Sequence, residues 1–149
     1  MKQIFGYCDG KSCAIESVSD PVFAEKMLGD GLAIVPAGDC GIISAPFDGK
    51  IVLVAGTKHA IGICDEEGTE FLIHIGIDTV KLDGAGFEIL TEVDADVKKG
   101  APLAKVDWTY LKSQNLDCSV MLINTDYSIS DLKKNIDIDV NSEVVCGEY

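Results

Sequence analysis

Glycine divides this chain into short β-rich runs, and this spacing constrains the fold more than any other feature. The 149 residues include 15 glycines, with short valine- and isoleucine-rich stretches between them. Short apolar runs bounded by turn signals are typical of antiparallel sandwiches and barrels. Helical signals are weak: residues 107–112 could form one short helix with Asp107 as N-cap, and residues 130–134 another. The pattern predicts an all-β fold with one or two very short helices.

The composition fits one folded domain and argues against nucleic-acid and membrane partners. The formal net charge is −13, which opposes binding to nucleic acid and to anionic lipid surfaces. No apolar run approaches the ~18 residues of a membrane span, and the first residues lack the apolar core of a signal peptide. The six cysteines contain no C-x-x-C pair, so we expect reduced, mostly buried thiols and a cytoplasmic protein. Residues 1–149 are expected to form a single domain.

Two short patterns occur twice. Asp-Gly-Lys stands at 9–11 and again at 48–50, each time before a β-rich run. A Val-x-x-x-Val-x-x-Gly pattern at 93–100 is repeated at 140–147. Such repeats predict two related halves packed on each other.

The only two histidines, His59 and His74, flank a short acidic turn in the middle of the chain. The β-rich runs 57–64 and 69–78 are joined by Asp-Glu-Glu-Gly at 65–68. Two such runs around a polar turn that ends in glycine predict a β-hairpin.

Two registers are open for this hairpin. If the turn is centred between Glu66 and Glu67, paired residue numbers sum to 133 and the two histidines face each other, with Cβ atoms roughly 4.5–5.5 Å apart. A G1 bulge at Gly68 would shift the pairing by one and put the histidines on opposite faces. We favour the symmetric register, because it places the apolar residues of 71–75 on one face and His74 with Asp78 on the other.

The surroundings of His74 favour a chemical role. It lies in the apolar stretch 71–78, and burial lowers the pKa of a histidine. The neutral imidazole keeps a lone pair with which it can attack phosphorus or carbon, or bind a metal. The second imidazole could donate a hydrogen bond to an anion formed on the first.

Five segments, in a fixed order, carry a family resemblance. They are residues 20–31, 45–49, 57–62, 72–80 and 84–87. Together they resemble the glucose-type IIA domain of the bacterial phosphoenolpyruvate-dependent sugar phosphotransferase system, with gaps, from about Gly10 to the C-terminus. The resemblance implies a mostly antiparallel β-sandwich of the barrel-sandwich hybrid type.

The resemblance also implies a role for each residue around the histidines. His74 matches the histidine that carries the phosphoryl group on Nε2, with its Nδ1 held by the backbone carbonyl of Gly76. His59 matches the second active-site histidine, which stabilises the phosphoryl group, and Thr57 would orient it. Asp20 and Asp78 match acidic residues where a basic partner residue docks. The apolar residues expected to contact partners are Val22, Phe23, Met27, Leu28 and Leu72.

The partners follow from the same resemblance. The donor would be the phosphorylated histidine phosphocarrier protein, and the acceptor would be the cysteine of a IIB domain of a membrane sugar permease. No cofactor and no metal are implied. The sequence departs from the family at Ala55-Gly56, which stand where a bulky aromatic often precedes the Thr-x-His motif.

Two other functions are alternatives. A zinc-binding hydrolase with a related hybrid fold could use both histidines and Asp78 as ligands. A regulatory module could bind partners without accepting phosphate, although it would have no need of the histidine pair.

Overall fold

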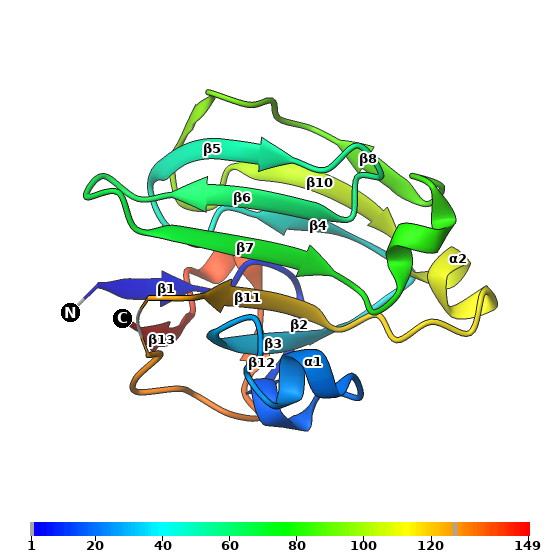
Figure 1. Ribbon diagram of the computed structural model, residues 1–149, viewed down its shortest axis with the longest axis horizontal. Coiled ribbons are helices and arrows are strands. Elements are labelled where there is room, and N and C mark those ends of the chain that lie inside the picture. Colours follow the sequence, from blue (N-terminus) through cyan, green and yellow to red (C-terminus); the bar gives the residue numbers. More distant parts are fainter. Residues whose placement is uncertain (1, 127) are drawn as a thin grey trace.

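The chain folds into an antiparallel β-sandwich, seen in a computed structural model that describes residues 2–126 and 128–149 (Figure 1). The strands are β1 (Gln3–Phe5), β2 (Gly10–Ala14), β3 (Asp30–Pro36), β4 (Cys40–Ser44), β5 (Gly49–Val54), β6 (Ala60–Cys64), β7 (Glu70–Ile75), β8 (Phe87–Ile89), β9 (Asp96–Val97), β10 (Pro102–Asp107), β11 (Val120–Asn124), β12 (Asp137–Ile138) and β13 (Val145–Glu148). The helices are α1 (Pro21–Ala24) and α2 (Trp108–Ser113), and the 3₁₀ turns are η1 (Ile15–Ser17), η2 (Thr79–Leu82) and η3 (Val140–Ser142). The expected all-β sandwich with very short helices is confirmed.

Two sheets enclose the main core. The larger has the order β12-β2-β3-β11-β7-β6-β5-β9, the smaller is β4-β10-β8, and β1 pairs with β13 beside them. In β7, Phe71, Ile73 and Ile75 are at most 2% exposed and belong to the main core. Alternate residues of a strand point to opposite faces, so His74 lies on the outer face of the larger sheet.

A second, smaller core covers part of that outer face. Its buried members are Ile15, Val18, Phe23, Ala33, Ile77, Met121 and Ile123. They come from η1 and its C-cap Val18, from α1, from the turn after β7 and from the strands β3 and β11, and Figure 1 shows α1 beside these two strands. Fully burying a side chain such as Phe23 contributes about 1.5–3 kcal/mol. This small core therefore fixes α1 next to the end of β7.

The Asp-Gly-Lys repeat reflects a real structural repeat. In the first copy, Gly10 and Lys11 pair with the two-residue edge strand β12. In the second, Gly49 and Lys50 pair with the two-residue edge strand β9. Asp9 accepts a hydrogen bond from the backbone of Val140, and Asp48 accepts one from Lys99. The second repeat, which aligned residues 93–100 with 140–147, is wrong in its alignment. Lys11 pairs with Asp137 and Lys50 pairs with Asp96. Residues 96–99 therefore correspond to 137–140.

The helix predictions had mixed outcomes. Residues 108–113 form α2, and the Asp107 side chain accepts the Tyr110 N–H at 2.9 Å, as expected of an N-cap. The helix expected at 130–134 is wrong, because Ser130 instead makes a β-bridge with Glu148. Helix α1 was not expected from the sequence, although it begins at Pro21 with Asp20 as its cap, the arrangement that favours a helix start.

All six cysteines are free. Cys8, Cys118 and Cys146 are buried, and Cys40 is exposed. Within the described part of the chain, no helix is long and apolar enough to cross a membrane.

Candidate active site

The hairpin of β6 and β7 does not have the register that we favoured. His74 pairs with Ala60 and Ile73 with Ile61, so the paired numbers sum to 134. The turn explains the shift: the Asp65 carboxylate accepts the N–H groups of Glu67 and Thr69, and Gly68 has a φ of +91°. This is the bulged arrangement that was the alternative, with glycine in the left-handed region.

The histidines nevertheless meet. His59 lies just before β6, after Lys58, whose φ is +64°. Strict alternation of faces therefore does not extend to His59. The two ring centroids are 5.0 Å apart and the rings are nearly perpendicular at 77°. The two histidines are close together, as expected, but they are not a directly opposed pair. The backbone turn at Lys58 brings the His59 ring to His74.

The His74 ring is held on two sides. Its Nδ1 lies 2.9 Å from the carbonyl oxygen of Gly76, and its ring contacts that of Phe23 at 4.9 Å between centroids. Since a carbonyl only accepts, Nδ1 carries the proton and Nε2 keeps its lone pair. Burial, and then the neighbouring His59, lower the pKa of His74. The ring is therefore neutral near pH 7.

The His59 ring is oriented by Thr57. The Thr57 hydroxyl lies 2.7 Å from Nδ1 of His59. Burial lowers the pKa of His59, and a hydrogen bond with the backbone of Thr57 partly opposes this shift. Both imidazoles are thus available in the neutral form, each with Nδ1 in a fixed contact.

Asp20 and Asp78 flank the pair from different elements. Asp20 caps α1 by accepting the Val22 N–H at 2.9 Å, and Asp78 has a φ of +61° and a side chain that is 58% exposed. Lys81 lies 4.0 Å from the Asp78 carboxylate. Both carboxylates raise the pKa of His74, less strongly than burial lowers it. They form an acidic rim close enough to act on the ring.

The expected apolar contact residues divide into two groups. Val22, Met27 and Leu28 are exposed, and Leu72 is half-buried. Phe23 is only 6% exposed, so it supports the His74 ring from beneath. Leu28 and Leu72 also line a hollow of about 330 Å³, together with Val52 and Leu53. Sequence reasoning missed Val52 and Leu53, which supply apolar surface near Ala55-Gly56.

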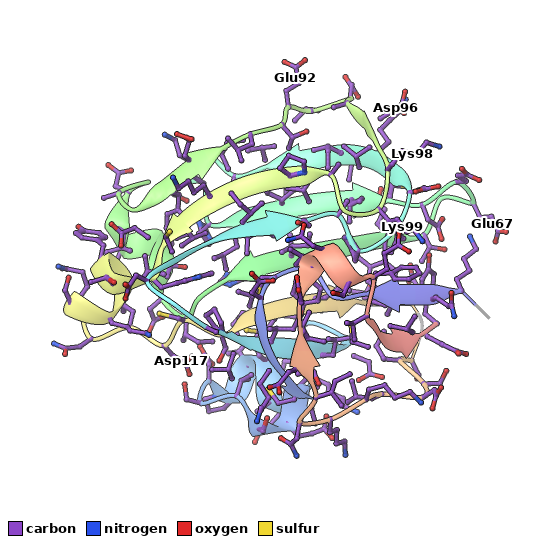
Figure 2. The ribbon with its side chains drawn as sticks, turned by 180° about the vertical axis from the view of Figure 1, so that it is seen from behind. Glu67, Glu92, Asp96, Lys98, Lys99 and Asp117 are labelled. Atoms are coloured by element: carbon purple, nitrogen blue, oxygen red, sulfur yellow. The ribbon has the colours of Figure 1, made fainter. Side chains whose placement is uncertain are left out.

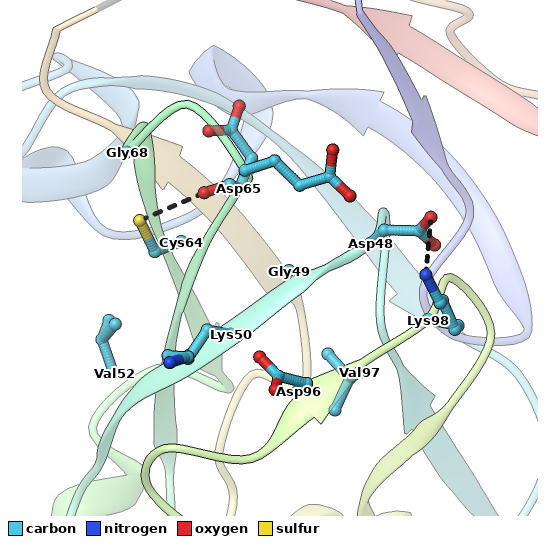
Figure 3. A pocket seen from close by; sticks show the side chains of 11 residues that line it. Asp48, Gly49, Lys50, Val52, Cys64, Asp65, Gly68, Asp96, Val97 and Lys98 are labelled. Carbon is cyan, nitrogen blue, oxygen red and sulfur yellow. Dashed lines mark hydrogen bonds and ion pairs between the residues drawn. The ribbon is translucent and has the colours of Figure 1, made fainter.

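A larger hollow, of about 620 Å³, lies at the other end of the β5–β6 pair (Figure 3). Lys50, Asp96 and the Asp48–Lys98 ion pair line it, together with Cys64. No histidine is in its lining. Within residues 2–126 and 128–149, no group of three or more His, Cys, Asp or Glu side chains is arranged to hold a metal ion, and this includes the two histidines with Asp78.

The family of the chain follows from comparison with known proteins. A family model described as the phosphoenolpyruvate-dependent sugar phosphotransferase system, EIIA 1, matches residues 2–129. The chain belongs to this EIIA family. Its function therefore lies in phosphotransfer during sugar uptake, and the recognised resemblance is confirmed.

Individual relatives agree with the EIIA assignment. The chain is 41% identical over 146 residues to a glucose-specific EIIA component from Staphylococcus epidermidis, covering 98% of this chain and 85% of that protein. It is 45% identical over 122 residues to a glucoside-specific EIICBA component from Staphylococcus carnosus, covering 82% of this chain and only 17% of that protein. The solved structure of glucose permease IIA from Mycoplasma capricolum matches with a TM-score of 0.84 and 36% identity, over 97% of this chain and 93% of that one.

Proposed function

We propose that this EIIA chain carries a phosphoryl group on Nε2 of His74, between the histidine phosphocarrier protein and the cysteine of a IIB domain of a membrane sugar permease. The observation that carries the proposal is the 2.9 Å contact between Nδ1 of His74 and the Gly76 carbonyl. This contact directs the lone pair of Nε2 outward. In a neutral ring, that nitrogen is the nucleophile.

The transfer needs two bond exchanges. First, Nε2 of His74 forms a bond to phosphorus as the bond between phosphorus and the donor imidazole breaks. Next, the thiolate of the IIB cysteine attacks the same phosphorus, and the bond to Nε2 breaks. Such transfers depend mainly on positioning and on stabilising the charge of the phosphoryl oxygens.

The neighbouring residues suit this charge. With the Thr57 hydroxyl donating to Nδ1 of His59, the Nε2–H of His59 can donate to a phosphoryl oxygen, and the rings are 5.0 Å apart. Asp20 and Asp78 would attract a cation of the partner protein. The exposed Val22, Met27 and Leu28 offer an apolar contact surface beside them.

The named relatives support the choice of acceptor. The EIICBA component of Staphylococcus carnosus joins its matching segment to B and C parts in one protein. We therefore take a IIB domain as the acceptor for this chain.

The test is a phosphorylation assay. The protein is incubated with phosphoenolpyruvate, the first enzyme of the system and the histidine phosphocarrier protein, and its mass is measured. We expect the gain of one phosphoryl group, labile in acid and stable in alkali, as a phosphoramidate is. His74→Ala should gain none, and a gain that persists in this variant would overturn the assignment.

A further inference from the structure

The turn that holds Gly76 is itself held by the segment after α2. Beyond the last paired residues of β7 and β11, the N–H of Gly76 donates to the carbonyl of Ser119 at 2.9 Å. The N–H of Ile77 donates to the carbonyl of Asp117, also at 2.9 Å. The position of the Gly76 carbonyl, which fixes His74, therefore depends on where residues 117–119 lie.

The Asp117 carboxylate fixes those residues. One oxygen accepts the N–H of Ser119 at 2.8 Å, and the other accepts the hydroxyl of Ser19 at 2.8 Å. Burial raises the pKa of Asp117, but these hydrogen bonds outweigh it and the pKa lies below its usual range. The carboxylate is therefore ionised at neutral pH, and hydrogen bonds to an ionised acceptor are the stronger kind.

The same carboxylate links two parts of the site. Ser19 directly precedes Asp20, the cap of α1, and Figure 2 shows Asp117 between the α2 end of the molecule and α1. Asp117 thus joins the segment that carries Asp20 to the turn that holds the histidine.

Gly76 has little freedom to adjust on its own. Its φ is +76°, and a Cβ at this position would overlap the Thr79 side chain and lie 3.2 Å from the Asp117 carbonyl oxygen. This close packing means that a shift of residues 117–119 would be passed on to the Gly76 carbonyl.

We propose that Asp117 is a positioning residue for His74: by holding residues 117–119 against Gly76 and Ile77, its carboxylate keeps the proton on Nδ1 and leaves Nε2 free. The proposal rests on the proposed function for its catalytic consequence. Its geometric content concerns the unphosphorylated protein and can be tested there.

The experiment uses Asp117→Asn and Asp117→Ala. The control is Asp139→Ala, because Asp139 makes the same two kinds of bond, to the Asn141 N–H and the Ser142 hydroxyl, within its own turn. The ¹⁵N signals of the imidazoles report the tautomer of His74, and amide hydrogen exchange reports the turn at Gly76 and Ile77. Single-turnover phosphorylation by the carrier protein gives the rate and the half-saturating carrier concentration.

In Asp117→Ala we expect a mixed His74 tautomer, faster exchange at Gly76 and Ile77, and a roughly tenfold slower transfer at saturating carrier. The rate at saturating carrier should fall by a larger factor than the half-saturating carrier concentration rises, because Asp20 and Asp78 keep their charges. Asp117→Asn keeps an uncharged acceptor and should show the same changes in smaller measure, with transfer at saturating carrier roughly threefold slower than in the wild type. Asp139→Ala should match the wild type in all of these measurements.

The proposal is overturned if Asp117→Asn keeps the wild-type tautomer and wild-type exchange at Gly76 and Ile77, a result that decides even where Asp117→Ala fails to fold. It is also overturned if Asp117→Ala folds and matches Asp139→Ala. If the wild type accepts no phosphoryl group, the proposed function fails, while the tautomer and exchange measurements still decide the role of Asp117.

Discussion

At the residue scale, each histidine has Nδ1 in a fixed contact and its other ring nitrogen available. The contact partners differ in kind: the carbonyl of Gly76 only accepts, whereas the Thr57 hydroxyl can donate. With the Thr57 hydroxyl donating, the rings carry opposite tautomers: a bare Nε2 on His74 and an Nε2–H on His59. One ring is suited to attack phosphorus and the other to donate to the oxygens around it.

This difference gives a prediction for His59→Gln. The variant should still accept phosphate from the carrier protein, because a partner cation can assist there. Its onward transfer to the IIB cysteine should be the more damaged step, since losing a donor to a charged group costs about 1.5–3 kcal/mol, or roughly ten- to more than a hundredfold in rate. Single-turnover transfer in each direction measures both steps, with His74→Gln alongside. The roles are reversed if His59→Gln cannot be phosphorylated while His74→Gln can.

At the element scale, the hairpin shows what the sequence could and could not predict. The apolar alternation in 71–75 identified a strand with one buried face, and that face is confirmed. The register was wrong because it depends on one side chain: the Asp65 carboxylate binds the turn backbone and favours the bulge at Gly68. Likewise, nothing in the local pattern at Lys58 indicated the left-handed residue that brings His59 to His74.

Asp65 also joins this hairpin to both ends of the described chain. Its carboxylate lies 2.9 Å from the Lys2 amine and accepts the Tyr149 hydroxyl at 2.7 Å. Burial alone would raise the pKa of Asp65, but the hydrogen bonds from Tyr149, Lys2 and the turn backbone lower it to about 2. The β6–β7 turn is thus linked to the residues flanking the β1–β13 pair.

We predict that Asp65→Asn destabilises the protein in a pH-dependent way. A carboxyl whose pKa is lower in the folded state stabilises it above the unfolded value, here 3.8, and loses this contribution as the pH falls toward 2. At pH 7 the variant should lose roughly 2 kcal/mol in its free energy of unfolding, measured by urea denaturation. The loss should shrink below about pH 4.

The control for this prediction is Asp137→Asn, whose carboxylate is 92% exposed and lies 3.7 Å from Lys11. An exposed pair of this kind contributes ~0–1 kcal/mol. A stability difference between wild type and Asp65→Asn that stays constant from pH 7 to pH 3 would show that the ionised carboxylate is not the stabilising group.

At the scale of the whole molecule, charge and apolar surface are combined at the histidine pair. The chain carries a net charge of −13, which draws cationic partners toward it at a distance. Beside the two histidines, the acidic rim of Asp20 and Asp78 adjoins the exposed Val22, Met27 and Leu28. The family resemblance identified these residues, whereas Val52 and Leu53 became part of the surface only through the pairing of β5 with β6.

The last prediction concerns the acidic rim, in the double variant Asp20→Asn with Asp78→Asn. Asparagine can keep the cap of α1 and tolerates the positive φ of Asp78, so the variant removes charge with little change in backbone. Phosphorylation by the carrier protein should slow several-fold at low salt, and the difference from wild type should shrink as salt rises, because exposed charges act mainly on encounter and are screened.

A matched control separates the rim from the net charge. Glu92→Gln with Asp96→Asn removes the same two charges from the edge of the molecule away from α1 (Figure 2). If the rim guides docking, only the Asp20 and Asp78 pair should change the rate strongly, and the half-saturating carrier concentration should rise with it. Equal slowing in both double variants would mean that the overall charge, and not these two carboxylates, governs the approach of the carrier.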